Sequence, residues 1–295
     1  MTRSPRGRSP WQREVDDVLH GVAGAFLFGV PLLYTMEVWW KGNFTSPLRM
    51  LVALGATYVA LVVIDAASGF RRQRATTTVR LLSDAAEGLA LGLMAASVSL
   101  LVLRLIGLGV GLEPLLGRIV HEAVPFSIGV GIANGLLRAR EEGGDDPTSG
   151  AEPSARTKAK RPAWRGTFAD AGATVLGATI IALAIAPTDE VPMIAAMLTG
   201  PWLLGLIFAS LAVSYVIVFE ASFSAPAGQG AYQGVLRSPL GETAGAYLVS
   251  LLTGALMLWL FQLIRPGDPL VQVIAYVIVL GLPATIGGAA GRLAV

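Results

Sequence analysis

The residues best suited to chemistry in this 295-residue chain are carboxylates that lie inside or beside long apolar runs. A charged side chain at the centre of a membrane helix costs roughly 2.5–3.5 kcal/mol on insertion scales, so a carboxylate kept there is a functional candidate by default. Carboxylate rings attract cations, and crowded carboxylates share protons. We therefore predict a cation or proton path along six acids: Glu37, Asp65, Glu87, Glu190, Glu220 and Glu242.

A structural role is the alternative for the same acids. Each lies a turn or so from the end of its run, where it can reach the headgroups or cap a helix. Glu87 follows Ser83 by four residues near an expected helix start, where capping and the helix dipole favour an acid. No Lys or Arg is obviously placed to neutralise the inner acids at their own depth, although Arg80 and its neighbours lie a turn or two outward. Both interpretations stay open.

The composition places the chain among membrane proteins. Hydrophobic residues make up 54% and charged residues 14%, against about a quarter charged in soluble domains. The mean hydropathy is +0.63. The chain has no cysteine, which excludes disulfides, thiolate metal sites and thiol catalysis. The basic residues lie between apolar runs and not on one face, so nucleic acid is not an expected partner.

Eight apolar runs are long enough to cross a bilayer, which takes roughly 20 residues as a helix. The expected fold is therefore an all-α integral membrane protein with eight transmembrane helices. The N-terminal stretch has no apolar core, so the first run is expected to stay as an anchor. The runs are 20–40, 48–69, 84–108, 117–138, 168–187, 201–221, 241–264 and 269–291.

The basic residues predict the direction of these spans. With the N-terminus in the cytoplasm, 17 of the 22 Lys and Arg residues fall on the inner side. The positive-inside rule therefore favours two cytoplasmic termini. Trp39 and Trp40 close the first span on the outer side, where an aromatic belt is expected.

The chain divides into a basic tail (1–19), a first membrane unit (20–138), a linker (139–165) and a second membrane unit (166–295). The linker is charged and rich in Gly, Pro and Ser, so we interpret it as a flexible cytoplasmic segment.

The two membrane units match each other in order, which predicts a tandem duplication. Each unit has an even number of spans, so both enter the membrane in the same direction, as parallel repeats do. A pore or site is then expected between the repeats. The matches pair Trp11 with Trp164 and Glu37 with Glu190 (153 positions apart), Asp65 with Glu220 and Glu87 with Glu242 (155), and Pro125 with Pro283 (158).

Other motifs concern packing more than chemistry. Pro125 and Pro283 are candidates for helix kinks, which either free carbonyls towards a cavity or simply shape the packing. Four GxxxG spacings predict close helix contacts. His121-Glu122 has no second His at metal spacing, so a helix-end or loop role is expected. No P-loop, HExxH or nucleophile elbow is present, so neither enzyme activity nor a cofactor is expected, and the residues do not identify a metal.

The stretch YTMEVWWKG (Tyr34–Gly42), with two four-span halves, resembles a bacterial family of integral membrane proteins built around a domain of unknown function. The resemblance implies a multi-pass topology in the bacterial plasma (inner) membrane, and it brings no activity and no functional residues. The leading hypothesis is thus a cation or proton channel or transporter in contact with the lipid bilayer. The alternative is a non-transport scaffold that binds partners through its basic linker. Either is compatible with a monomer or a homo-oligomer.

Overall fold

The computed structural model describes the backbone of residues 10–70, 78–107, 109–143, 163–220 and 239–293, and every regular element in these ranges is helical. Much of the expected tail (1–9) and linker (144–162), and the side chain of Glu220, lie outside the described part. In chain order the helices are α1 (Pro10–Leu33), α2 (Met36–Gly42), α3 (Pro47–Phe70), α4 (Thr78–Val102), α5 (Leu112–Gly143), α6 (Ala163–Ile185), α7 (Glu190–Met197), α8 (Gly200–Tyr215) with its π-helical continuation η1 (Val216–Glu220), α9 (Pro239–Leu260) and α10 (Leu270–Leu293).

Six of these helices are long and apolar enough to cross a membrane by themselves. Two further candidates are bent pairs, with α1 and α2 meeting at 88° and α6 and α7 at 89°. The chain is therefore a multi-pass protein of six spans, or of eight where each bent pair is one span. The run 20–40 is interrupted between α1 and α2, whereas 168–187 is continuous in α6 as far as Ile185 and the bend to α7 follows at its end.

Local sequence accounts for both interruptions. α6 ends at Ile185, two residues before Pro187, and a residue that precedes proline is disfavoured in the α conformation. Pro31 lies in the last turn of α1 and brings no N–H to the carbonyl of Leu27. Thr35 then takes an extended backbone (φ −104°, ψ 95°) between α1 and α2. The weakened end of each long helix thus gives way to a short helix in a new direction.

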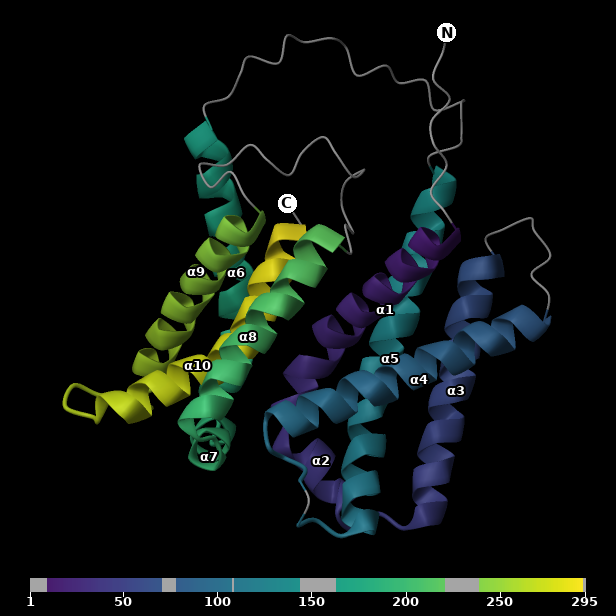
Figure 1. Ribbon diagram of the computed structural model, residues 1–295, viewed down its shortest axis with the longest axis horizontal. Helices are drawn as coiled ribbons and strands as arrows, with labels where there is room; N and C mark the ends of the chain where they lie inside the picture. Colours follow the sequence, from purple (N-terminus) through teal and green to yellow (C-terminus); the bar gives the residue numbers. More distant parts are fainter. Residues whose placement is uncertain (1–9, 71–77, 108, 144–162, 221–238, 294–295) are drawn as a thin grey trace, which may run out of the picture.

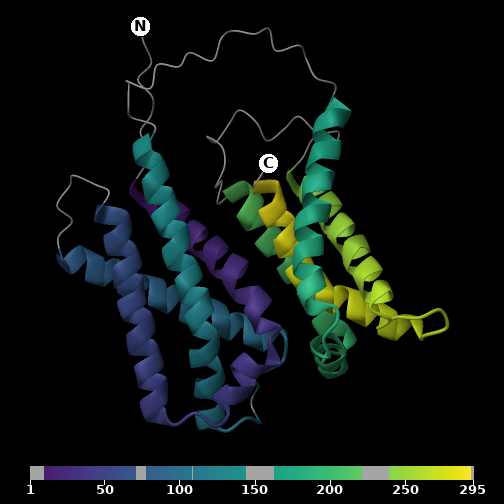
Figure 2. The same cartoon turned by 180° about the vertical axis from the view of Figure 1, so that it is seen from behind.

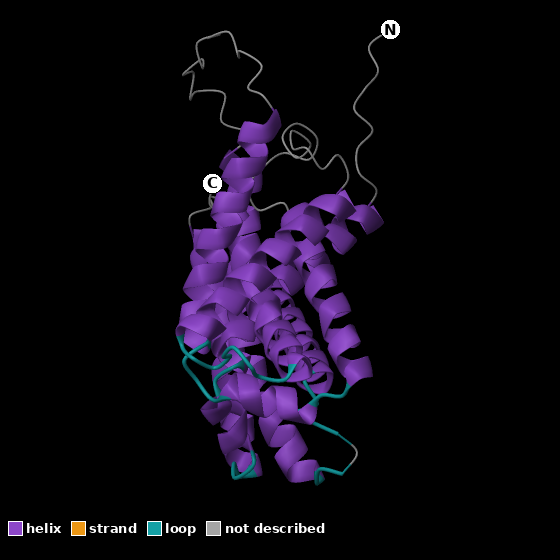
Figure 3. Ribbon diagram, turned by 90° about the vertical axis from the view of Figure 1, so that its left-hand side faces the viewer, coloured by secondary structure: helices purple, strands orange, loops and turns teal. Residues whose placement is uncertain are grey.

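The helices form two groups that stand side by side, α1–α5 and α6–α10 (Figures 1 and 2). The start of α1, the ends of α3 and α5, the start of α6 and the end of α10 all lie towards the upper end in Figure 1. The turns that follow α4 and α9 lie towards the other end, as do most of the loops in the side view of Figure 3.

Glycines let the long helices of each group pack backbone to backbone. A Cβ added at Gly24 of α1 would overlap the carbonyl oxygen of Gly129 on α5. A Cβ added at Gly177 of α6 would overlap the carbonyl oxygen of Gly287 on α10. Gly291, four residues further along α10, approaches the carbonyl of Ala173 in the same way. The close packing predicted from GxxxG is confirmed on α10.

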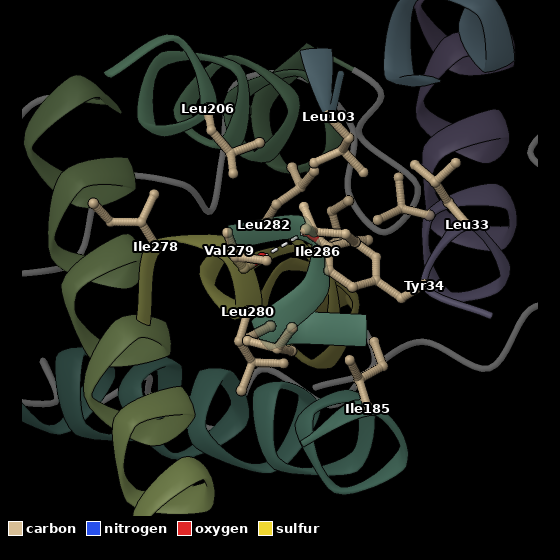
Figure 4. Close-up of a cluster of buried hydrophobic side chains, with 14 of the residues drawn as sticks. Leu33, Tyr34, Leu103, Ile185, Leu206, Ile278, Val279, Leu280, Leu282 and Ile286 are labelled. Atoms are coloured by element: carbon tan, nitrogen blue, oxygen red, sulfur yellow. Dashed lines mark hydrogen bonds between the residues drawn. The ribbon is translucent and has the colours of Figure 1, made fainter. Parts of the chain in front are cut away.

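Large apolar side chains fill the contact between the two groups (Figure 4). Leu33 and Leu103 come from the first group, and Leu206 and Val279 from the second, and all four are fully buried. They belong to one continuous core. A pathway between the groups therefore requires these side chains to part.

Candidate functional site

The two bends meet where the helix groups touch. Met36, the first residue of α2, donates its backbone N–H to Oε1 of Glu190, the first residue of α7, at 3.4 Å. Oε2 of Glu190 is buried, and no described residue offers it a hydrogen bond. Of the six acids proposed from the sequence, Glu190 is thus the one at the junction of two broken helices, with half of its carboxylate unsatisfied.

A second hydrogen bond joins the groups beside this junction. The hydroxyl of Tyr34 donates to the carbonyl oxygen of Val279 at 2.6 Å (Figure 4). Val279 lies four residues before Pro283, which has no N–H to give it, so the tyrosine replaces the missing helical donor. The carbonyl that the kink candidate Pro283 frees therefore meets Tyr34. Val279 lies near the middle of the span Leu270–Arg292, which places the junction at mid-span depth.

Replacing Tyr34 with phenylalanine should destabilise the protein by about 1–3 kcal/mol, because the buried Val279 carbonyl loses its donor. The loss should appear as a lower midpoint of thermal unfolding in detergent micelles. Tyr58→Phe is the matched control, since Tyr58 donates to the carbonyl of Leu82, which lies inside α4 and can still accept a helical N–H when the hydroxyl is removed. Equal losses in the two variants would contradict the role of Tyr34.

On the side away from the chain ends, an arginine organises the loops of the first group. Arg118 of α5 donates to Oδ1 of Asn43 at 2.7 Å and to the carbonyl of Leu105, and its guanidinium lies 5.6 Å from the Trp39 ring. Trp39 is 2% exposed, so the expectation that it lies in an aromatic belt is wrong, whereas Trp40 is 49% exposed. These contacts turn Arg118 towards the loops.

Glu242 has a charge partner that sequence reasoning missed. Arg292, near the end of α10, forms an ion pair with Glu242, near the start of α9, and the two side chains are only 9% and 16% exposed. The expectation of no base at this depth is therefore wrong for Glu242. The partner lies 50 residues away along the chain, so only the fold reveals it.

The remaining candidates differ in their burial. Asp65 is buried, at 5% exposure, on α3, whereas the side chains of Glu37 and Glu87 are exposed. Pro125 lies inside α5, which continues through it as α10 continues through Pro283. In the described part of the chain, no group of three or more His, Asp or Glu side chains is placed to hold a metal ion.

One buried acid was assigned to the wrong environment. α5 begins at Leu112, earlier than the 117 expected, so Glu122 lies near the middle of the span Leu112–Gly135 and not at a helix end. Its side chain has no exposed surface, and neither carboxylate oxygen has a hydrogen-bond partner among the described residues. The sequence does show Glu122 as an acid inside an apolar run. The run 117–138 begins five residues after the helix does, which makes the acid look close to the helix end.

Apolar helices of membrane-spanning length, with polar groups enclosed between them, define a multi-pass integral membrane protein. The model of the family described as "Putative integral membrane protein (DUF2391)" matches residues 17–295, and the chain belongs to this family. The resemblance to a family of integral membrane proteins is thereby confirmed for nearly the whole chain. No curated protein and no solved structure matches the chain.

Proposed function

We propose that this protein moves protons or small cations across the inner membrane of a bacterium, with both termini in the cytoplasm. In this proposal the helix groups α1–α5 and α6–α10 are tandem four-span repeats, and each bent pair is one span. Transport, and not enzyme chemistry, is the proposed activity.

The ends of α4 and α9 support the repeats. The residues that follow these helices include Arg104 (φ 55°) and Gln262 (φ 61°), and a non-glycine residue at positive φ is uncommon. After Arg104, Leu105 donates its N–H to the carbonyl of Leu100 at 2.8 Å, and after Gln262, Leu263 donates to the carbonyl of Leu258 at 2.9 Å. Each of these hydrogen bonds spans five residues. Both helices thus end in the same left-handed cap. Two bends of nearly equal angle add to this support.

The buried faces of α4 and α9 support the same conclusion and refine the pairing of acids. Placed 158 positions apart, the two faces agree at six of seven positions: Ala85, Gly92, Ala95, Ala96, Ser99 and Leu100 correspond to Thr243, Ser250, Thr253, Gly254, Met257 and Leu258. On this alignment the counterpart of Glu242 is Asp84, one turn before the Glu87 that the sequence match suggested. The inner acid pair of the proposal is therefore Asp84 and Glu242.

The position of Glu190 carries the transport proposal. Transporters with broken helices place ion sites where helix ends meet near the bilayer midplane, because the interrupted backbone offers unpaired polar groups. Glu190 adds a half-satisfied carboxylate at such a meeting point, between the proposed repeats. Buried Asp65 and the Glu242–Arg292 pair lie nearer the cytoplasmic end in this orientation. Glu220 is included in the proposed path only because it is the sequence counterpart of Asp65.

Liposomes that contain the purified protein test the proposal. Under imposed pH and Na⁺ or K⁺ gradients, Glu190→Gln should lower the flux by about tenfold or more, since about 1.4 kcal/mol of lost charge interaction is a tenfold change in rate. Glu37→Gln is the matched control, because Glu37 is the repeat counterpart of Glu190 and its side chain is exposed. An absence of flux in the wild-type protein, or equal flux in both variants, would count against transport through this junction.

A further inference from the structure

We propose that Glu122 is a reversible proton-binding site in the middle of the membrane, facing the break between α1 and α2. Only the role of this site rests on the proposed function, because the site would identify the proton as the transported species. The site itself follows from the packing of α5, and a test of it needs no measurement of transport.

Glu122 lies on the face of α5 that packs against α1 and α2. Phe126 and Gly129 touch α1, and Arg118 lies over a ring of α2. These residues and Glu122 are spaced by four, four and three positions, which places all of them on one stripe of the helix. The Glu122 side chain therefore points towards α1 and α2, and its complete burial agrees with this direction.

The contacts on either side place Glu122 level with the break. On one side, Phe126 packs directly on Gly29, near the end of α1. On the other side, a Cβ added at Gly42, the last residue of α2, would lie 2.6 Å from the nitrogen of Arg118. Glu122 lies midway between Phe126 and Arg118, so it faces the segment in which α1 ends and α2 begins.

A proton fits this position better than a metal ion does. An unpaired carboxylate in apolar surroundings is too costly to remain charged without a partner. A hard cation needs several oxygen ligands, whereas neither oxygen of Glu122 has a polar partner among the described residues. Leu33 and Val30, near the end of α1, are themselves fully buried. A proton neutralises the carboxylate without further ligands or space.

No charged group on the packed helices replaces that proton. Arg118, one turn away, is engaged by Asn43 and the Leu105 carbonyl, and Tyr34 at the break donates to Val279. Neither carboxylate oxygen of Glu122 has a hydrogen bond to any other described titratable side chain of α1–α5, which are Glu14, Asp17, His20, Glu37, Lys41, Arg49, Tyr58, Asp65, Arg80, Asp84, Glu87, Glu113 and His121.

The fold does not demand an acid at this position. Glu122 lies three residues before Pro125 in α5, and Leu280 lies three residues before Pro283 in α10. Leu280 is fully buried and apolar. The second helix group thus builds the same place with a leucine, which makes Glu122→Leu a variant that should fold.

Labelling with dicyclohexylcarbodiimide tests the site in the intact protein in detergent. The reagent adds the O–H of a protonated carboxyl group across its C=N bond, and the acylisourea then rearranges to a stable acylurea that peptide mass spectrometry locates. At neutral pH, Glu122 should be labelled about tenfold more than Glu113, an exposed acid in the first turn of the same helix, because burial disfavours the charged form. Labelling of Glu122 should fall as the pH is raised.

Infrared spectroscopy provides the second measurement. The carbonyl band of a protonated carboxylic acid should weaken as the pH is raised, and Glu122→Leu should remove that change while Glu113→Gln retains it. A band that stays constant at every pH, or no labelling of Glu122 at any pH, would overturn the site. Reversible protonation of Glu122 without flux in liposomes would retain the site and contradict the transport proposal. Flux in liposomes without labelling of Glu122 would retain the transport proposal and contradict the site.

Discussion

Gly177→Ala is expected to destabilise the protein by about 3 kcal/mol or more, the upper end of the cost of overpacking. The added Cβ would overlap the carbonyl oxygen of Gly287 and lie 2.8 Å from its carbonyl carbon and 2.9 Å from the nitrogen of Gly291. All three atoms belong to backbone, so no side chain can rotate away. α6 and α10 would have to separate along their whole contact, which also removes the dispersion energy of close packing.

Gly172→Ala is the matched control on the same helix. Nothing lies within 4 Å of a Cβ added there, and alanine is favoured over glycine in a helix by roughly 1 kcal/mol. The control should keep or slightly raise the midpoint of thermal unfolding in detergent, while Gly177→Ala lowers it by several degrees. Similar midpoints for the two variants would mean that the α6–α10 contact is looser than described. Gly24→Ala, against Gly129 on α5, should repeat the loss in the first helix group.

The membrane class and the number of apolar segments follow from the sequence because they depend on composition and length alone. The bends do not. Hydropathy averages the apolarity of a run and is blind to its backbone angles, so it shows neither the break inside 20–40 nor the short helix α7 that follows 168–187 at an angle of 89°. Pro187 marks the second break, but Pro125 and Pro283 lie inside helices that continue. A proline therefore did not by itself distinguish a break from a tolerated position.

The candidate site is predictable only in part, because the sequence shows the acids themselves but not their partners, which lie far away along the chain. Glu190 was identified as a candidate from its match with Glu37, yet its contact with Met36 requires the two helix groups to meet. Glu122 was misjudged because the start of α5 was placed five residues late, which moved it from mid-span to the helix end. Span boundaries are the weakest part of a hydropathy prediction, and here they decided the interpretation of an acid.

Removing Arg292 is the second change with a large expected effect. Arg292→Met leaves Glu242 as an uncompensated charge between α9 and α10, and breaking a buried ion pair from one side costs about 3–5 kcal/mol. The low exposure of both side chains, 9% and 16%, makes replacement of the arginine by water difficult. Unfolding in detergent should therefore begin at a markedly lower temperature in this variant.

The double variant Arg292→Met with Glu242→Met separates the pair from the packing. Removing both charges leaves no unpaired group, so the double variant should recover most of the stability that Arg292→Met loses, as replacement of buried ion pairs by apolar residues does. Recovery would mean that the pair is not required for folding and is available for a role in the proposed pathway. If the double variant is no more stable than Arg292→Met, the loss comes from the packing of the arginine stem and not from the charge left on Glu242.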